Sequence, residues 1–348
     1  MMNLRDTYAS VDPILTTLAQ GYMLPETNIA NFIAPVVDTP TRAGRTLRFG
    51  KEAFAVIDFK RSYGTNIPAV QSRFDSDPYA LDQEVVAWEL PEEVIENAGE
   101  GPAQVDLRAI ETRNAMSRLM NAYEVTTAAA VGTLASYEAA TTTNVGLAYA
   151  TWTLFAAAAA GKNQPVGAAD WAAATSNPIT DVLTMKRAVA DQIGIRPNSA
   201  VIGSAVFDRL LTTEAILDRI QFTTADSIDT DVLARYFGLE RGIRVAEGRQ
   251  LAADGSLTPV FPENAILLFY SPLSASDSVM PAGGASAATP AFAYTYQLTG
   301  TPAVRPEYYI RERRVVRAEI TVERVANVTG LGATGKYGSG FYCANVLV

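Results

Sequence analysis

Apolar side chains recur at steps of three and four residues between residues 106 and 137. This spacing is typical of one face of a helix, and the stretch holds no Pro and a single Gly, Gly132. Asp106 stands where its carboxylate can cap the first turn. At a rise of about 1.5 Å per residue the helix would be about 48 Å long, so we expect it to be the backbone of the fold. The apolar stripe consists of Met116, Leu119, Met120, Tyr123, Thr127, Ala130, Val131 and Leu134.

Two segments before this helix have the composition of β-strands, residues 45–59 and residues 84–90. The second alternates around Trp88 and stops at Pro91. The polar stretch that separates them is long for a loop inside a compact domain. We therefore predict a long hairpin whose tip leaves the body. An isolated two-stranded hairpin is marginally stable in water, so we expect this one to lie on a neighbouring subunit.

The first forty residues show no single period. A short helix is predicted after Pro13, and apolar residues gather without strict spacing between Ile29 and Val37. We interpret the region as an extended arm that packs in pieces on another surface, with a second copy of the chain as one candidate. A frayed terminus is the alternative interpretation.

The second half of the chain alternates helices and strands. A helix is predicted to start at Ser176 to Pro178 and to end at Gly194, with Trp171 as an anchor in the preceding loop. Short strands and helices then follow one another through residue 270, and Ser204 is a candidate helix cap. This alternation favours a compact α/β lobe.

Strand signals dominate the end of the chain, after a Ser-, Ala- and Gly-rich segment, residues 271–290, that is typical of a surface loop. In the segment that runs up to residue 328, Ala318, Ile320 and Val322 are predicted to face one side of a sheet. Glu319, Thr321 and Glu323 are predicted to face the other side. The last apolar residues, 342–348, are expected to fold back as a strand.

Composition narrows the possible functions. With 348 residues the chain exceeds what one hydrophobic core usually supports, so two or more lobes are expected. It contains no His, which excludes catalysis that uses a His base or His-ligated zinc, and its single Cys, Cys343, excludes an internal disulfide framework. The net charge of −9 is unfavourable for tight nucleic-acid binding, although a local basic face remains compatible with it.

No segment has the character of a signal peptide or a membrane span. The N-terminus lacks an apolar core. The most apolar run, residues 145–160, is rich in Ala and too short to cross a bilayer. We predict a buried helix or a strand–helix junction there, in a soluble protein.

Two motifs resemble binding sites. Residues 330–336, GLGATGK, match a P-loop pattern, but Tyr337 replaces the Ser or Thr that holds magnesium and no helix pattern follows. We interpret this motif as a flexible glycine turn. Asp226, Asp229 and Asp231 lack the spacing of a calcium loop, so helix capping is the preferred interpretation.

The order of these segments resembles the major capsid protein of tailed bacteriophages, the Hong Kong ninety-seven fold family. Residues 176–220 and residues 31–59 carry the likeness most clearly. The fold class that the resemblance implies is α+β. Its parts would be an N-terminal arm (1–44), an E-loop hairpin (45–91), a P-domain (92–195) with spine helix 106–137, an α/β A-domain (196–298), and P-domain strands with the C-terminus (299–348).

The resemblance implies a structural subunit without catalytic activity or cofactor. Copies would assemble, in the host cytoplasm, into pentamers and hexamers of an icosahedral virion capsid around double-stranded DNA. Implied partners are the chain itself, a separate scaffolding protein, a portal, decoration proteins and packaged DNA through non-specific contacts, with no membrane. The same fold builds encapsulin nanocompartments, which remain an alternative. An enzyme based on carboxylates and a cell-surface lattice protein are the other function classes.

Candidate contact residues follow from this interpretation. The candidates for contacts between subunits are Phe32, Phe49, Lys51, Phe59, Lys60 and Trp88. The densest basic run is Arg311, Arg313, Arg314 and Arg317, which either faces DNA or another subunit or forms a solvated strand face paired with Glu312, Glu319 and Glu323. Some members of the family join a Lys of one subunit to an Asn of another, for which Lys51 or Lys60 and Asn345 have the required residue types.

Overall fold

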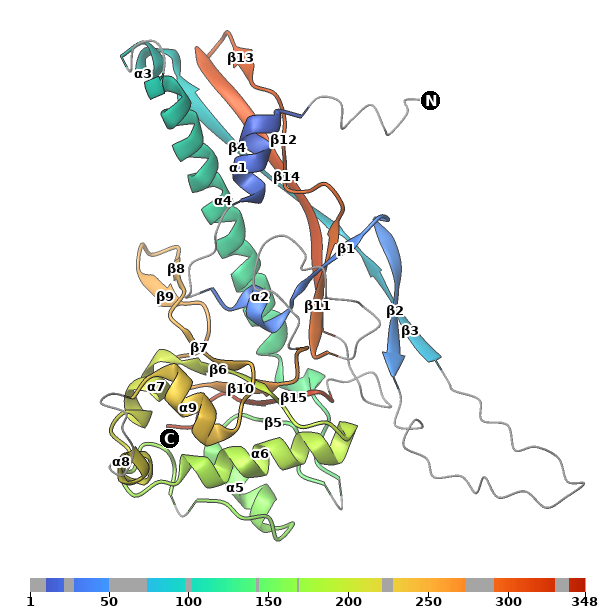
Figure 1. Cartoon of the computed structure of the whole chain (residues 1–348), viewed down its shortest axis with the longest axis vertical. Coiled ribbons are helices and arrows are strands. Elements are labelled where there is room, and N and C mark those ends of the chain that lie inside the picture. The colour runs from blue at the N-terminus through green and yellow to red at the C-terminus, as the bar shows by residue number, and fades with distance from the viewer. Residues whose placement is uncertain are drawn as a thin grey trace, which may run out of the picture.

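The computed structural model describes residues 11–21, 28–49, 74–97, 102–141, 144–167, 169–220, 228–272, 291–328 and 338–347. An elongated upper part is built on one long helix and a six-stranded sheet, and a lower lobe is built on a five-stranded sheet (Figure 1). The predicted motif at residues 330–336 and most of the predicted loop at residues 271–290 lie outside the described residues.

The long helix α4 (Pro102–Val131) forms the axis of the upper part, as predicted (Figure 1). Its 30 residues make it about 45 Å long. It begins four residues before the predicted start, so Asp106 lies inside the helix and is not its cap. It ends before Gly132, and the residues beyond it, Leu134–Ser136, form a separate 3₁₀ turn, η3. The middle of the predicted stripe is buried, whereas Leu134 is exposed.

The sheet of the upper part is organised around one long strand, β14 (Val315–Val328). On one side β14 pairs with β4 (Asp82–Pro91) over ten residues. As predicted, Ala318, Ile320 and Val322 share one face, which is buried in the cluster beneath α4, but Thr321 and Glu323 on the opposite face are buried as well. The other partners of β14 are β11 (Ala293–Leu298), β12 (Ala303–Val304) and β13 (Tyr308–Ile310), and β1 (Val36–Thr39) extends the sheet beyond β11.

The lower lobe has the strand order β5–β15–β10–β6–β7. The predicted elements are present, although Ser204 is the first residue of α7 and Gly203, which has no side-chain cap, takes the cap position. The strands are β5 (Ala148–Tyr149), β6 (Ser199–Gly203), β7 (Gly242–Ala246), β10 (Ile266–Phe269) and β15 (Gly340–Cys343). The helices are α5 (Trp152–Ala160), α6 (Pro178–Ile193), α7 (Ser204–Leu210), α8 (Glu214–Ile220) and α9 (Thr230–Phe237).

Two predicted boundaries differ from the observed packing. Helices α5 and α6 were expected in the P-domain, but they cover the sheet of the lower lobe (Figure 1). Strand β11 was expected in the A-domain, but it pairs with β14 in the upper sheet. The run at residues 145–160 is a strand–helix junction, as predicted, and no helix among the described residues is long and apolar enough to cross a membrane.

The first part of the chain packs on its own body. Helix α1 (Pro13–Gln20) is capped by Asp12 and lies against α4, and α2 (Ala30–Ile33) is buried beside α4 and the lower lobe. Strand β1 runs parallel to β11. The apolar residues between Ile29 and Val37 are therefore buried against the same chain, which corrects the expectation that they pack on another surface.

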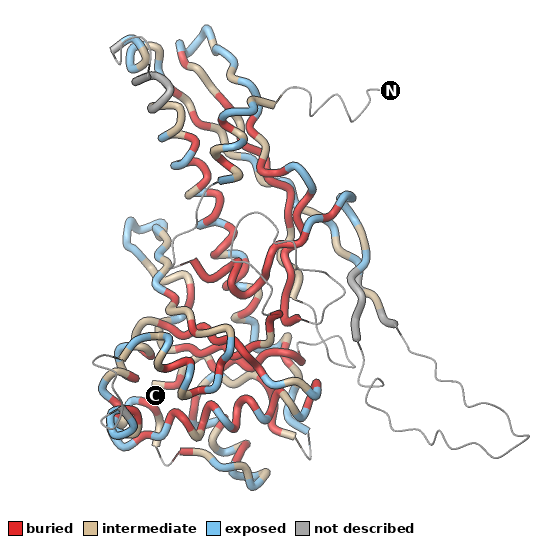
Figure 2. Tube along the Cα trace, in the orientation of Figure 1, coloured by how far each residue is buried: buried red, intermediate tan, exposed pale blue. Residues whose placement is uncertain are grey.

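Two hairpins leave the body on opposite flanks. β2 (Ala43–Phe49) pairs with β3 (Phe74–Ala80), and β8 (Arg249–Leu251) pairs with β9 (Leu257–Pro259). The predicted return arm of the first hairpin, residues 84–90, belongs instead to β4 and the upper sheet, and the short helix α3 (Glu92–Asn97) connects β4 towards α4. Figure 2 shows that buried residues line the inner sides of α4 and β14, whereas the described parts of both hairpins are mostly exposed or half-buried.

Candidate functional site

The β2–β3 hairpin is the most prominent projecting element of the upper part (Figure 1). Within the described ranges, its two strands pair with each other and with no other strand. Backbone groups along both outer edges of the hairpin are thus available to a further strand or to water. The sequence predicted a projecting hairpin here, although it assigned the wrong return strand.

The root of this hairpin is fixed to the body by aromatic and ionic contacts. The ring of Tyr79 stacks on Tyr296 of β11, with 4.3 Å between centroids and 9° between planes. Its hydroxyl lies 3.2 Å from the Thr39 hydroxyl. Arg42 forms a bidentate pair with the buried carboxylate of Glu323, at 2.6 and 2.7 Å. The hairpin therefore leaves the body in a defined direction.

Gly44 is required for this root geometry. A Cβ atom at this position would lie 2.6 Å from the Tyr79 hydroxyl and 2.8 Å from its ring carbon Cζ. The ring has little freedom to move away, because its other face stacks on Tyr296. A side chain at position 44 would therefore push the hairpin off its seat.

The structure places the predicted contact residues in different environments. Lys51, Phe59 and Lys60 lie outside the described residues, as does the side chain of Phe49, whose backbone belongs to β2. Proposed crosslinking through Lys51 or Lys60 is therefore a prediction that the described residues do not test. Asn345, its expected acceptor, lies in the lower lobe, where its carbonyl oxygen accepts from Trp152 N–H at 2.8 Å.

Phe32 and Trp88 are corrected as contact candidates, because each is only 4% exposed within its own chain. Phe32 packs edge-on against Phe269, with 5.7 Å between ring centroids. The guanidinium of Arg241 lies 4.3 Å from the Phe32 ring centroid and donates to the Phe32 carbonyl oxygen. Trp88 lies in the cluster between β4, β14 and α4. Both side chains hold the fold together.

The basic run lies at the tip and start of the β13–β14 hairpin. Arg313 contacts Glu89 at 3.1 Å. Arg317 lies 3.6 Å from the same carboxylate and 3.8 Å from Glu319. Arg311 and Arg314 are exposed in the turn, where Arg314 has a positive φ of 48°. These ion pairs match the interpretation of a solvated strand face, with Glu89 as an acid that the sequence did not single out.

A buried arginine in the upper part was missed by the sequence analysis. The side chain of Arg324 is 2% exposed and contacts Glu84 on β4 at 2.7 Å. It also donates to the carbonyl oxygen of Leu119 at 3.1 Å. This single guanidinium joins β14, β4 and α4. The only signal in the sequence was a charged residue on an alternating strand, which does not reveal whether the charge is buried.

A buried carboxylate joins the N-terminal segment to the long helix. Glu124 of α4 accepts from Ile29 N–H at 3.1 Å and from the Asn28 side-chain amide at 3.3 Å. Burial raises the pKa of the Glu124 carboxyl, while the hydrogen bond from Ile29 opposes the rise. Gly248, at the base of the β8–β9 hairpin, lies so close that a Cβ there would be 2.9 Å from Glu124 Oε1. Glu124 thus lies where three segments meet.

The lower lobe contains a similar buried acid, Asp181 of α6. Its Oδ2 accepts from the indole N–H groups of Trp152 and Trp171 at 2.9 and 2.8 Å, and its Oδ1 accepts from Gly167 N–H at 2.6 Å. Burial raises the pKa of Asp181, and these three hydrogen bonds oppose the rise. The prediction of Trp171 as an anchor is confirmed, since its side chain is fully buried.

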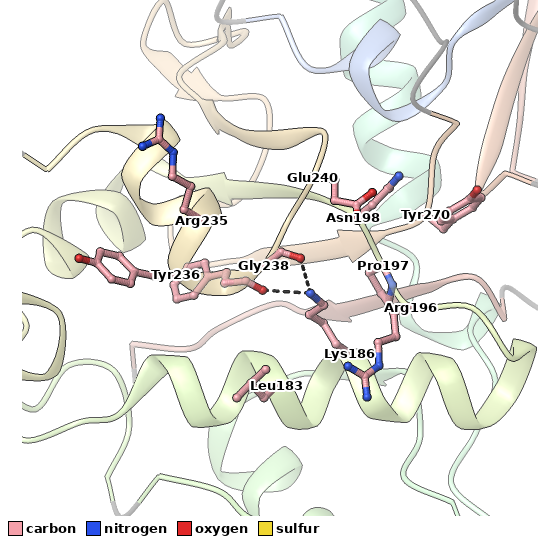
Figure 3. Close-up of a pocket in the computed structure, with 11 residues that line it drawn as sticks. Leu183, Lys186, Arg196, Pro197, Asn198, Arg235, Tyr236, Gly238, Glu240 and Tyr270 are labelled. Atoms are coloured by element: carbon pink, nitrogen blue, oxygen red, sulfur yellow. Dashed lines mark hydrogen bonds between the residues drawn. The ribbon is translucent and has the colours of Figure 1, made fainter. Parts of the chain in front are cut away.

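A pocket of about 460 Å³ opens between α6 and the end of α9 (Figure 3). Lys186 is buried at its wall and donates to the carbonyl oxygens of Phe237 and Gly238 at 3.0 and 2.6 Å. Burial lowers the pKa of Lys186, with a smaller contribution from Arg196. In Figure 3 the side chains of Arg196 and Arg235 point away from each other. The Lys186 ammonium therefore satisfies carbonyl groups at the carboxyl end of α9. The guanidinium groups of Arg196 and Arg235 do not converge on the same point as this ammonium.

The described residues contain no group of His, Cys, Asp or Glu side chains that could hold a metal ion. Asp229 caps α9 by accepting from Thr230 N–H, which confirms the capping interpretation for that residue. Cys343 is fully buried, and burial raises the pKa of its thiol to about 12. A thiol in this state is a poor nucleophile. Among the described residues, the features that can serve a function are therefore the exposed surfaces and the packing contacts.

Comparison with known proteins gives three consistent likenesses. A family described as phage major capsid protein E matches residues 152–280. A major capsid protein of Burkholderia phage BcepMu is 26% identical over 312 residues, covering 84% of this chain and 85% of that protein. A phage-related protein from Bordetella bronchiseptica RB50 is 26% identical, with a TM-score of 0.71 over 97% of this chain and 98% of that one.

A more distant likeness concerns the fold alone. A virus-like particle protein from Pyrococcus furiosus is 10% identical, with a TM-score of 0.50 over 94% of this chain and 98% of that one. The matched lengths show that the similarity extends over both parts of the molecule.

Proposed function

Since the chain is a bacteriophage major capsid protein with the Hong Kong ninety-seven fold, we propose that it self-assembles into the pentamers and hexamers of an icosahedral shell. The shell encloses double-stranded DNA in the virion, and it forms in the host cytoplasm. The subunit acts by packing against copies of itself and carries out no catalytic step.

The β2–β3 hairpin carries this proposal. Contacts of Tyr79 and Arg42 with the body hold its root rigidly. Its two strands nevertheless pair with no other strand among the described residues. A two-stranded ribbon that extends from a folded body gains stability when another surface covers it. In a shell, that surface belongs to the adjacent subunit. The firm root and the uncovered strands together suit an element that docks on a neighbour.

Other partners follow from the role of a capsid subunit. We include a separate scaffolding protein, a portal, decoration proteins and packaged DNA, which is contacted without base recognition. The ion pairs of Arg313 and Arg317 with Glu89 reduce the free positive charge of that surface. This surface therefore supports contacts between subunits better than a strong attachment to phosphates.

The test is assembly of the purified full-length chain, followed by negative-stain electron microscopy and analytical ultracentrifugation over a wide concentration range. We expect rings of five or six subunits and closed shells. Shells formed in infected or expressing cells with the packaging components are expected to protect double-stranded DNA from nuclease. A chain that sediments as a compact monomer at every concentration, with or without a coexpressed scaffold, would contradict the proposal. Shells that consistently contain a protein cargo in place of DNA would favour the nanocompartment alternative.

A further inference from the structure

The β8–β9 hairpin is a second projecting element, and its turn is tightly ordered. Asp254 accepts from the backbone N–H and the hydroxyl of Ser256 at 2.9 and 2.6 Å. Ala252 N–H donates to the Ser256 carbonyl oxygen at 2.8 Å, and Gly255 supplies the left-handed conformation with a φ of 83°. The tip is therefore held in one shape by its own hydrogen bonds.

The base of the same hairpin is fixed to the body. Val260 N–H donates to the Gly248 carbonyl oxygen at 2.9 Å, and Arg249 pairs with Glu263 at 2.7 Å. Gly248 packs directly on the Glu124 carboxylate of α4. The hairpin thus stands beside the long helix with a fixed base and a fixed turn (Figure 1).

This ordered hairpin presents two leucines to solvent. Leu251 and Leu257 are 73% and 67% exposed. They are direct cross-strand partners, so their side chains lie on the same face. A single exposed leucine is ordinary in a protein surface, but a rigid pair at the end of a projecting ribbon forms an apolar knob. We call these two residues the leucine knob.

The opposite flank of the molecule carries an exposed face on the β2–β3 hairpin. On the root of the β2–β3 hairpin, Ala43 pairs with Ala80 and Arg45 pairs with Pro78, and all four side chains are exposed. The alternate residue Tyr79 faces the body. The outer face is thus formed by small apolar side chains with one cation at its side. We call these four residues the small-residue face.

We propose that the leucine knob of one copy packs on the small-residue face of the next copy in the ring. The two surfaces lie on opposite flanks and at a similar height along the long axis (Figure 1). A closed ring of identical subunits joins one flank of each molecule to the other flank of its neighbour. The bulky leucines fill the space that small side chains leave, and exposed Asp254 beside the knob is matched by exposed Arg45. This contact rests on the proposed shell function and specifies where adjacent subunits meet.

The first test replaces both leucines by serine, L251S/L257S, and measures the protein concentration at which rings and shells appear. We expect this threshold to rise about tenfold or more, because two apolar side chains no longer leave water on assembly. The melting temperature of the unassembled chain should stay unchanged. The matched control is Leu154→Ser, since Leu154 is 56% exposed on α5 of the lower lobe, and its threshold should equal that of the wild type. An unchanged threshold for the double variant would overturn the proposal.

A second test uses a disulfide between copies and remains informative if the serine variant folds poorly. The variant L257C/A80C is assembled and oxidised, and the products are separated on a non-reducing denaturing gel. Native Cys343 is fully buried and does not compete. We expect covalent ladders that end at closed rings, and only monomer bands from each single-cysteine variant.

The two failures are distinguishable. Intact shells of the double-cysteine variant that yield only monomer bands would overturn the leucine-knob contact and leave the shell function in place. Absence of rings and shells from the wild-type chain under every condition would contradict the shell function itself.

Discussion

The guanidinium carbon of Arg324 lies 4.0 Å from the centroid of the Tyr123 ring, so a strand near the end of the chain is joined to the middle of the long helix. The Tyr123 hydroxyl in turn contacts the Thr295 hydroxyl of β11. Burial raises the pKa of Tyr123, with the Thr295 hydrogen bond and the charge of Arg324 acting in the opposite direction, so the phenol stays neutral at physiological pH. This group of side chains fixes the position of α4 over its sheet.

We predict that Arg324→Met destabilises the subunit by about 3 kcal/mol, because the carboxylate of Glu84 and the carbonyl of Leu119 lose their partner inside the fold. Chemical denaturation of the unassembled chain measures this free energy. Arg313→Met is the control, since Arg313 forms an exposed pair that is expected to contribute less than about 1 kcal/mol. Equal effects of the two substitutions would refute the role assigned to Arg324.

We predict that Asp181→Asn destabilises the lower lobe by about 2 kcal/mol or more. An amide cannot accept at both of its terminal atoms, so either the two indole N–H groups or Gly167 N–H would lose an acceptor. Because the buried Trp152 and Trp171 are the affected donors, tryptophan fluorescence reports the change directly. Asp191→Asn, an exposed position on the same helix, should leave both the emission and the stability unchanged.

We predict a pH-dependent stability contribution from Glu124. Its pKa is raised above the ordinary value of 4.5, so the protonated acid is favoured in the fold. The stabilisation is fully present below the unfolded-state pKa and is lost as pH rises through the raised value. The stability of the wild type relative to Glu124→Gln should therefore fall as the pH rises above 4.5, as measured by thermal unfolding of the unassembled chain. A difference that stays constant as the pH rises above 4.5 would disprove the effect, and Glu111→Gln on the same helix serves as the control.

We predict that Tyr79→Ser impairs assembly much more than folding. The substitution removes the ring that stacks on Tyr296 and leaves the hairpin root without its aromatic contact. The concentration needed for shell formation should rise about tenfold, whereas the main unfolding transition should shift less, since Tyr79 packs only on the small cluster around Tyr296 and not on the two larger clusters. Tyr236→Ser, half-buried on α9, is the control. A normal assembly threshold for Tyr79→Ser would show that the hairpin direction is unimportant.

The elements that depend on local spacing were predictable. Helix α6 begins after Asn177 and ends at Gly194, where a φ of 74° favours glycine, and both signals are visible in the sequence. The alternation around Ile320 correctly indicated which side of β14 packs beneath α4, although Thr321 and Glu323 on the other side are buried as well. Patterns of this kind report which face of an element is covered.

The pairing of strands was less predictable, because alternation does not reveal the partner. Residues 84–90 were assigned to a hairpin with residues 45–59, but they pair with β14 more than two hundred residues later in the chain. The true return strand, Phe74–Ala80, contains Asp75, Asp77 and Pro78, which strands disfavour. These residues are tolerated because β3, among the described strands, pairs only with β2 and does not lie inside a larger sheet.

The burial of individual side chains also depended on distant contacts. Phe32 and Trp88 are large and apolar, so each could have filled a neighbour's surface or the chain's own core. Only the positions of Phe269 and of the β14 cluster decide between the two. Arg324 was missed for the related reason that its acid partner, Glu84, lies far away in the sequence.

Both sheets combine strands from distant parts of the chain: β1 and β4 pair with β11 and β14, and β5 pairs with β15. During synthesis the early strands leave the ribosome long before their partners exist, so neither sheet can close until β14 and β15 have emerged. A polypeptide that stops short of residue 340 would lack the strand between β5 and β10. We therefore expect prematurely terminated chains to be unable to complete the lower lobe, because β5 and β10 would have no strand between them.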